Sequence, residues 1–195
     1  MEYFDIINAN GELLNEIRSR DDVHRLGLWH RAVHIWIYRK YQGTYELLLQ
    51  KRSASKDSHP SCYDMSCAGH VSAGDDYLES AIRELQEELG VSLTESDIIP
   101  TFIYPVNYQK YFHDKLFIEN ELNQVYICQL DLNLDECKLQ IEEVESLCWV
   151  AFEQIPDFMN QNQHCLIEDE VNKVLEWVNQ YEEEKKTLSF TKKIS

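Results

Sequence analysis

The sequence predicts an α/β protein with a mixed β-sheet, organised as a single domain. Alternating apolar residues indicate strands early in the chain, and further strands follow a central amphipathic helix. A second helical pattern closes the chain, an order typical of helices packed against a mixed sheet. With 195 residues, of which 44% are hydrophobic, the chain is long enough to bury one core.

The first elements are predicted strands. Residues 3–17 contain two apolar runs joined by a polar turn, which predicts a short hairpin. Apolar residues alternate in residues 31–40, so one face of that strand is apolar. A turn at residues 41–43 leads into residues 45–52, whose apolar centre is continuous. We expect these two strands to form a hairpin inside the sheet.

The central helix is predicted from residue 76 to residue 89. Its apolar positions recur at helical spacing, and these are Leu78, Ala81, Ile82, Leu85 and Leu89. Gly90 follows directly, where a C-cap glycine is common.

Three further strands and a helix are expected after Gly90. Residues 98–106, 124–132 and 144–152 have strand patterns, and a polar, aromatic segment lies between the first two. An amphipathic helix is predicted over about residues 165–186. We therefore divide the single domain, residues 1–195, into an N-terminal extension (about 1–28), a core (29–160) and a C-terminal helix and tail (161–195).

Composition restricts the class of partner. The formal net charge of −17 repels phosphate backbones, which argues against a nucleic-acid polymer or an anionic membrane as partner. The six cysteines form no C-x-x-C pair, as expected of reduced thiols in a cytoplasmic protein. The N-terminal residues contain no long apolar run, so neither a signal peptide nor a membrane span is predicted there.

Carboxylates crowd one part of the central helix. Glu84, Glu87 and Glu88 stand at positions i, i+3 and i+4, where side chains converge on one patch. Like charges at this spacing repel by about 0.2–0.5 kcal/mol per pair. A hard divalent cation such as Mg²⁺ or Mn²⁺ would offset that repulsion. A solvated acidic face with Arg83 as its counter-charge is the simpler alternative.

The glycines around this helix favour the metal site. Gly69 and Gly74 bracket a tight loop before it, and Gly69 is followed by five residues, Asp75, seven residues and the run RELQEELGV, residues 83–91. This spaced pattern resembles the Nudix box, which has a glutamate where this chain has Asp75. Such a dense set of fixed positions is a specific signal. Asp75 keeps the charge but is shorter by one methylene group.

The resemblance implies a Nudix α/β/α sandwich and a Mg²⁺-dependent hydrolase in which water attacks a diphosphate linkage. Carried over by position, the metal-binding catalytic carboxylates are Glu84, Glu87 and Glu88. The same correspondence makes Arg83 the residue that orients a glutamate of the helix.

Residues from about Phe4 to Trp149 also resemble type I isopentenyl-diphosphate isomerase, which is itself a Nudix-fold enzyme. The metal site of that family uses two early histidines, a loop histidine and two glutamates of an E-x-E segment. The matching residues here are His24, His30, His70, Glu119 and Glu121. Arg52 and Lys56 match the positions where that family holds the diphosphate with cations.

One departure separates this chain from the isomerases. They require a cysteine two residues before the loop histidine, and this chain has Ala68 there. Cys67 is one position too early, which on a strand points its thiol to the opposite face. Isomerisation requires a side chain that donates a proton to, or removes one from, an allylic carbon of the substrate. Because alanine can do neither, the sequence favours hydrolysis over isomerisation.

The sequence therefore predicts a metal-dependent hydrolase of a small organic diphosphate. The general base would be one of the helix glutamates or Glu121, and Arg52 and Lys56 would hold the distal phosphate. An isomerase and a non-catalytic ligand sensor are the alternatives. The N-terminal hairpin and the C-terminal helix are candidate contacts for a homodimer, and the sequence does not identify the substrate.

Overall fold

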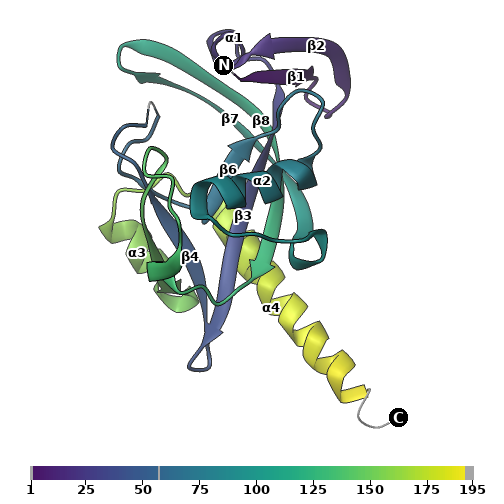
Figure 1. Cartoon of the computed structure of the whole chain (residues 1–195), viewed down its shortest axis with the longest axis vertical. Helices are drawn as coiled ribbons and strands as arrows, with labels where there is room; N and C mark the ends of the chain where they lie inside the picture. Colours follow the sequence, from purple (N-terminus) through teal and green to yellow (C-terminus); the bar gives the residue numbers. More distant parts are fainter. Residues whose placement is uncertain (1, 57, 192–195) are drawn as a thin grey trace. The chain divides into compact units, whose positions relative to one another are not determined.

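The computed structural model describes residues 2–56 and 58–191. The chain divides into two compact units, Met1–Cys165 and Leu166–Ser195. The second unit consists mainly of helix α4 (Glu168–Thr191), which confirms the predicted C-terminal helix (Figure 1). The first unit contains all the strands of the described residues and every predicted site residue.

A seven-stranded sheet forms the centre of the first unit (Figure 1). Its main path runs β5-β4-β3-β8-β7, while β6 also pairs with β3 and β9 pairs with β4. The strands are β3 (His30–Tyr41), β4 (Thr44–Arg52), β5 (Tyr63–Asp64), β6 (Cys67–His70), β7 (Ile99–Phe112), β8 (Lys115–Gln129) and β9 (Val144–Ala151). Strands β3 and β8 run parallel and the other pairs antiparallel, so the predicted mixed sheet is confirmed.

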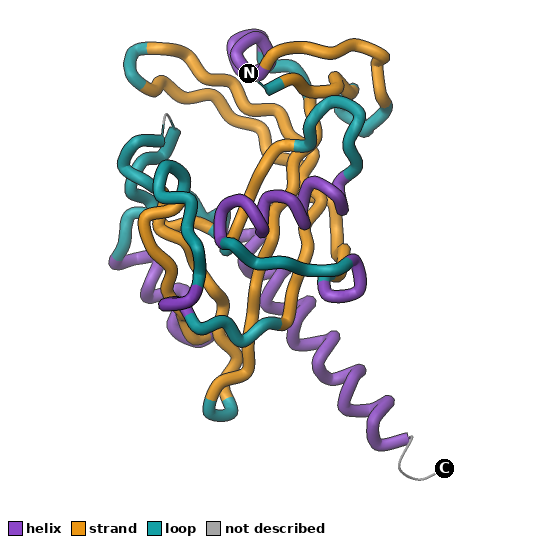
Figure 2. The backbone as a smooth tube through the Cα atoms, in the orientation of Figure 1, coloured by secondary structure: helices purple, strands orange, loops and turns teal. Residues whose placement is uncertain are grey.

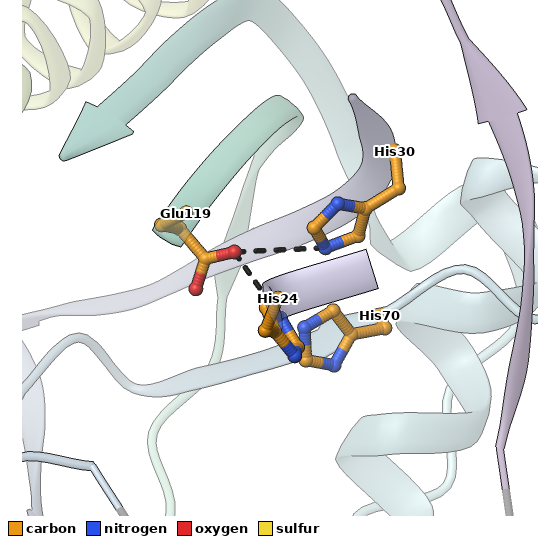
Figure 3. Close-up of side chains that lie close together, drawn as sticks. All are labelled: His24, His30, His70 and Glu119. Atoms are coloured by element: carbon orange, nitrogen blue, oxygen red, sulfur yellow. Dashed lines mark ion pairs between the residues drawn. The ribbon is translucent and has the colours of Figure 1, made fainter. Parts of the chain in front are cut away.

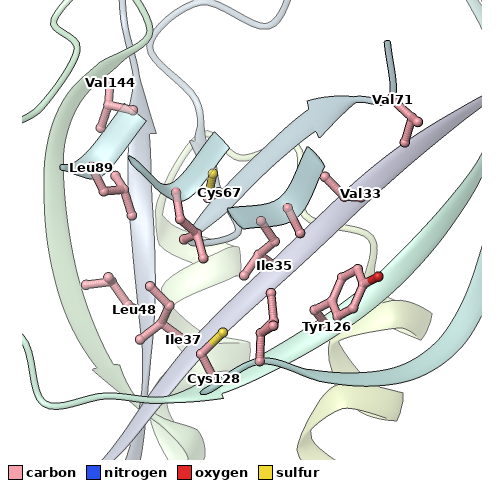
Figure 4. Packing of buried hydrophobic residues seen from close by; sticks show 13 residues of the cluster. Val33, Ile35, Ile37, Leu48, Cys67, Val71, Leu89, Tyr126, Cys128 and Val144 are labelled. Carbon is pink, nitrogen blue, oxygen red and sulfur yellow. The ribbon is translucent and has the colours of Figure 1, made fainter. Parts of the chain in front are cut away.

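Helix α2 (Tyr77–Leu89) covers one face of this sheet and confirms the predicted central helix. Asp76 caps its N-terminus by accepting a hydrogen bond from the Glu79 N–H at 2.8 Å. Gly90 ends it in the left-handed conformation, with φ 69°. Buried side chains of α2 and β3 belong to one hydrophobic cluster, part of which Figure 4 shows. They are Val33, Ile35 and Ile37 of β3 and Ala81, Leu85 and Leu89 of α2.

The N-terminal extension folds as a hairpin and a short helix. Strands β1 (Tyr3–Ile7) and β2 (Leu13–Ser19) form a separate antiparallel sheet, as predicted. Helix α1 (Arg20–Leu26) follows, with Ser19 as its N-cap and Gly27 as its C-cap. No helix was predicted in this segment, because few of its residues are apolar and helical spacing is therefore not visible.

Strands β7 and β8 extend further than predicted. The polar, aromatic segment between them was expected to separate two strands, but it continues both as one long hairpin (Figure 2). Tyr108 pairs with Glu119 and Val106 with Glu121 in this hairpin. The two glutamates of the E-x-E segment thus lie on a regular strand.

The remaining elements are short: α3 (Ile155–Gln161) and the 3₁₀ turns η1 (Glu95–Asp97), η2 (Leu134–Glu136) and η3 (Phe152–Gln154). Among the described residues, no helix combines the length and apolar character needed to cross a membrane.

Candidate active site

Three histidines and two glutamates meet at one end of the sheet, and Figure 3 shows the histidines with one of the glutamates, Glu119. Strand β3 pairs with both β6 and β8, so that His70 lies opposite Ala32, and Glu121 lies opposite His30. The members of this His–Glu cluster are His24 on α1, His30 on β3, His70 on β6, and Glu119 and Glu121 on β8. The chain segments that carry them are far apart in the sequence and are brought together by strand pairing.

The side chains of the His–Glu cluster point toward a common centre. Ligand atoms of His24, His30, His70 and Glu119 all lie within 4.8 Å of one another. Glu119 Oε1 is 3.2 Å from His24 Nε2 and 3.7 Å from His30 Nε2. Glu121 Oε1 lies 3.3 Å from His30 Nε2 and 3.2 Å from His70 Nε2.

Aromatic rings enclose the His–Glu cluster. Phe4 stacks on His70 and His30, with ring centroids 4.6 and 5.2 Å apart. Phe117 stacks on His24 at 4.3 Å. These contacts orient the imidazoles and limit access of water to them. Neither phenylalanine was predicted as a site residue, because an apolar residue on a strand gives no signal beyond core packing.

The His–Glu cluster fits a divalent cation. His24 Nε2 and Glu119 Oε1 are buried without a hydrogen-bond partner, which is costly unless something else satisfies them. Burial is the largest cause that lowers the pKa of His24 to about 4 and that of His70 to about 4, leaving neutral imidazoles. Burial acts to lower the pKa of His30 as well, but the hydrogen bond to Glu121 raises it above its ordinary value. Neutral imidazole and carboxylate are the ligand forms that a metal requires, so a bound cation would displace a proton from His30.

The two glutamates of the cluster differ in protonation. Burial raises the pKa of Glu119 to about 9, with the charge of Glu121 adding to it. Burial opposes ionisation of Glu121 as well, but hydrogen bonds from His30 and His70 lower its pKa well below the usual value. Glu121 is therefore ionised and is held between two rings.

The helix glutamates lie beside this cluster, and Gly69 gives one of them room. A Cβ added at Gly69 would overlap the carboxyl group of Glu84, which lies against the backbone of β6. The glycine at this position is therefore a steric requirement. Glu88 is also buried, whereas the Glu87 side chain is 54% exposed.

Arg83 connects the helix glutamates to the His–Glu cluster. Its Nη1 lies 2.8 Å from Glu84 Oε1 and 3.2 Å from Glu87 Oε2. Its Nη2 donates a hydrogen bond of 3.2 Å to the backbone carbonyl of His70. One guanidinium thus orients two carboxylates and also contacts the strand that carries a cluster histidine.

Burial raises the pKa of two glutamates of α2, Glu84 and Glu88. It is the largest cause that raises the pKa of Glu84 to about 7, although Arg83 opposes the shift. Burial and then the charge of Glu84 raise the pKa of Glu88 to about 8. Among the described residues, these carboxylates are not part of a group as tight as the His–Glu cluster. Their mutual repulsion is the feature that a cation would relieve.

The two predicted phosphate-binding residues lie near the end of α2. Lys56 Nζ pairs with the carboxylate of Glu143, and its charge acts to lower the pKa of Glu88. Arg52 is paired with Asp64 at 3.1 Å. Glu143 was not predicted as a site residue, because nothing in its neighbourhood distinguishes it from the other acids of the chain.

The loop before α2 is fixed by β1. Gly74 has φ 88°, which favours glycine, and its N–H donates to Asp5 Oδ2 at 2.9 Å. The Asp75 carbonyl accepts a hydrogen bond of 2.9 Å from Arg31. Among the described side-chain hydrogen bonds, Asp75 takes part only through its backbone carbonyl. Asp5, in the N-terminal extension, fixes the loop through the Gly74 N–H.

Ala68 and Cys67 occupy opposite faces of β6. Cys67 is fully buried in the core cluster beneath α2. Ala68 lies opposite His34 in the pairing with β3 and precedes His70 by two residues, so both face the side of the His–Glu cluster. The thiol of Cys67 is therefore directed away from that cluster.

A NUDIX domain profile matches residues 28–170 of this chain. The chain belongs to the Nudix hydrolase family. Nudix hydrolase 3 of Arabidopsis thaliana is 40% identical over 173 residues, which are 88% of this chain but 22% of the plant protein's length. An uncharacterized Nudix hydrolase of Clostridium acetobutylicum is 30% identical over 159 residues, 82% of this chain and 74% of that protein.

Solved structures show the same Nudix fold. A Deinococcus radiodurans protein superposes with a TM-score of 0.66 at 21% identity, covering 88% of this chain and 98% of that one. A Caenorhabditis elegans Ap4A hydrolase complex gives 0.51 at 20% identity, with 77% and 98% covered. The predicted fold class, with its mixed sheet and C-terminal helix, is confirmed.

Gly69→Ala tests the packing of Glu84 on β6. The added methyl group should displace the Glu84 carboxylate and weaken Mg²⁺ binding by roughly tenfold, the lower end of effects seen when support of a metal ligand is lost. Isothermal calorimetry with MgCl₂ measures this. Ser72→Ala, in the same loop, is the control; equal Mg²⁺ affinity in both variants would contradict the assignment.

The raised pKa values predict how stability depends on pH without metal. Between the ordinary pKa of 4.5 and about 8, folded Glu88 holds a proton that the unfolded chain has lost, so stability falls as pH rises. Thermal unfolding in EDTA at several pH values in this range should show the decline, and Glu88→Gln should reduce it. Glu79→Gln, on the exposed part of α2, should decline as wild type does.

Proposed function

We propose that this Nudix protein is a metal-dependent hydrolase that cleaves the diphosphate linkage of a nucleoside-diphosphate-linked or other organic diphosphate. The observation that carries the proposal is the pair of carboxylates on α2, with Glu84 largely buried and paired with Arg83 and Glu88 buried one turn further along. Membership of the Nudix hydrolase family supports it.

The helix residues would hold the catalytic cation. Glu84, Glu87 and Glu88 offer oxygen ligands suited to Mg²⁺, with Mn²⁺ as the alternative. Such a cation supplies Lewis acidity to the phosphorus and a reactive water molecule. Arg83 keeps Glu84 and Glu87 oriented toward it.

Lys56 and Arg52 supply local positive potential in an acidic chain. The ammonium group of Lys56, near Glu88, is suited to the distal phosphate of the substrate. A glutamate of α2 is the general base that we favour. Glu121 is less suited, because hydrogen bonds from two histidines lower its pKa and commit it to the His–Glu cluster.

The His–Glu cluster is a second metal centre of different chemistry. Its three imidazoles suit Mn²⁺ or Zn²⁺ better than Mg²⁺. This centre supports the likeness to the isopentenyl-diphosphate isomerase subgroup. Ala68, however, offers no acid or base on the cluster side of β6, so isomerase activity is not favoured.

The accompanying proposals concern compartment and assembly. All six cysteines are free thiols, which is consistent with a cytoplasmic location. We propose a small-molecule substrate rather than a nucleic-acid polymer or a membrane, given the net charge of −17. The N-terminal hairpin remains our candidate for a homodimer contact.

The hydrolase proposal is tested by the release of phosphorylated cleavage products, separated by ion-exchange chromatography, from a panel of nucleotide sugars, dinucleoside polyphosphates, nucleoside triphosphates, coenzyme A and prenyl diphosphates. Mg²⁺-dependent release is expected from at least one class. The double variant Glu87→Gln, Glu88→Gln should abolish it while circular dichroism stays unchanged, because neutral amides bind Mg²⁺ poorly.

Glu79→Gln should retain activity in the same assay. Full activity of the double variant would refute the assigned site. Mg²⁺ binding without turnover on any compound of the panel would favour the ligand-sensor alternative.

The His–Glu cluster predicts a metal-dependent gain in stability. Adding Mn²⁺ or Zn²⁺ to EDTA-treated, dialysed protein should raise its melting temperature, since a ligand that binds the folded state stabilises it. His24→Ala should remove most of that gain. His113→Ala, in the β7–β8 turn, is the matched control. A gain that persists in the His24 variant would place the metal elsewhere.

A further inference from the structure

Arg52 is more deeply engaged with the protein than a free phosphate ligand would be. Its side chain is 15% exposed and pairs with Asp64, whose side chain is 9% exposed. Nη1 donates to Asp64 Oδ2 at 3.1 Å, Nη2 to the Ser58 carbonyl at 3.1 Å, and Nε to the His59 carbonyl at 3.2 Å. Three of the five N–H groups are thus committed to acceptors of the protein.

The two carbonyl acceptors belong to the loop between β4 and β5, two residues of which have an uncommon backbone conformation. His59 and Ser61 have φ values of 46° and 59°, a left-handed conformation that is uncommon outside glycine. The backbone N–H of Arg52 also donates to the Cys62 carbonyl at 2.9 Å. Arg52 therefore holds the end of this loop through the main chain and an earlier part of it, at Ser58 and His59, through the guanidinium.

The same loop carries Lys56. The Lys56 N–H donates to the Ser53 carbonyl, and the Ser53 N–H donates to the Glu143 carbonyl. Lys56 Nζ pairs with the Glu143 carboxylate. The neighbouring Gln140 N–H donates to the Glu88 carbonyl at 2.9 Å, so the loop is connected through this segment to the end of α2.

We propose that Arg52 is a positioning residue whose buried pair with Asp64 shapes this loop, so that Lys56 alone of the two cations meets the distal phosphate. This inference rests on the proposed hydrolase function, because it assigns roles at the same site. Both cations have a carboxylate partner, Asp64 for Arg52 and Glu143 for Lys56. Arg52 also donates to two loop carbonyls, whereas the ammonium group of Lys56 has only the Glu143 carboxylate among its described side-chain contacts. The pair is mutually dependent, since removal of either partner leaves a buried charge uncompensated.

Two variants distinguish this role from direct phosphate binding. Lysine at position 52 keeps the charge but cannot satisfy two carbonyls and a carboxylate in a planar array. Arg52→Lys should therefore behave like Arg52→Gln. Asp64→Asn should also weaken phosphate binding. If Arg52 bound phosphate directly, Arg52→Lys would keep most of the affinity and Asp64→Asn would increase it.

The experiment measures binding of inorganic pyrophosphate in the presence of Mg²⁺ by calorimetry, in a double-mutant cycle on the full chain. Arg52→Gln and Lys56→Gln are each expected to weaken binding about tenfold, with little further loss when combined, because the first acts through the second. Lys51→Gln, a neighbouring cation paired with Glu145 at 2.7 Å, is the control that should bind as wild type does.

Amide hydrogen exchange gives a readout that does not depend on activity. Exchange of residues 58–62 should accelerate in Arg52→Lys and Asp64→Asn but not in Lys56→Gln. Two results would overturn the positioning role. One is that the losses of pyrophosphate affinity in Arg52→Gln and Lys56→Gln simply add in the double variant. The other is that residues 58–62 exchange as slowly in Arg52→Lys and Asp64→Asn as in the wild type. Absence of turnover on the substrate panel would refute the hydrolase proposal, while the cycle and the exchange data would still decide the role of Arg52.

Discussion

The His–Glu cluster depends on the pairing of β3 with both β6 and β8. The parallel ladder to β8 places Glu121 beside His30, and the antiparallel ladder to β6 places His70 two residues along the same face. Because side chains alternate along a strand, a slip of one residue in either ladder would direct these groups into the apolar core. Burial of the apolar face against α2 fixes the register. The core thus determines how the side chains of the His–Glu cluster are placed.

Two groups of carboxylates are held in protein surroundings that disfavour their charges. Burial raises the pKa of Glu84 and Glu88 although Arg83 and Lys56 oppose the shift, and Glu119 is buried beside Glu121. Because the net charge of the chain is −17, the overall field of the protein is negative and does not stabilise these carboxylates. Such sites are stabilised by the ligand they bind, at a cost to the stability of the empty protein.

Local patterns predicted much of the fold and part of the site. The α2 helix was recognisable from its apolar residues at helical spacing, and Gly69 from its place in the spaced pattern that ends with residues 83–91. The α1 helix was not, because Val23 is its main buried apolar residue. Phe4 and Glu143 were missed for a related reason: their roles arise from contacts with distant segments. The contacts of Arg52 with Asp64 and the loop carbonyls likewise depend on a fold that one sequence does not display.

The enclosure of the His–Glu cluster has a practical consequence for how the domain is delimited. His24 and Phe4 lie in the first 27 residues, outside the profile match at residues 28–170. The loop before α2 is also held by Asp5. A fragment cut at the start of the profile match would keep the sheet and the glutamates of α2, yet lose one imidazole and the ring that covers two others. In this chain the His–Glu cluster therefore extends upstream of the profile match.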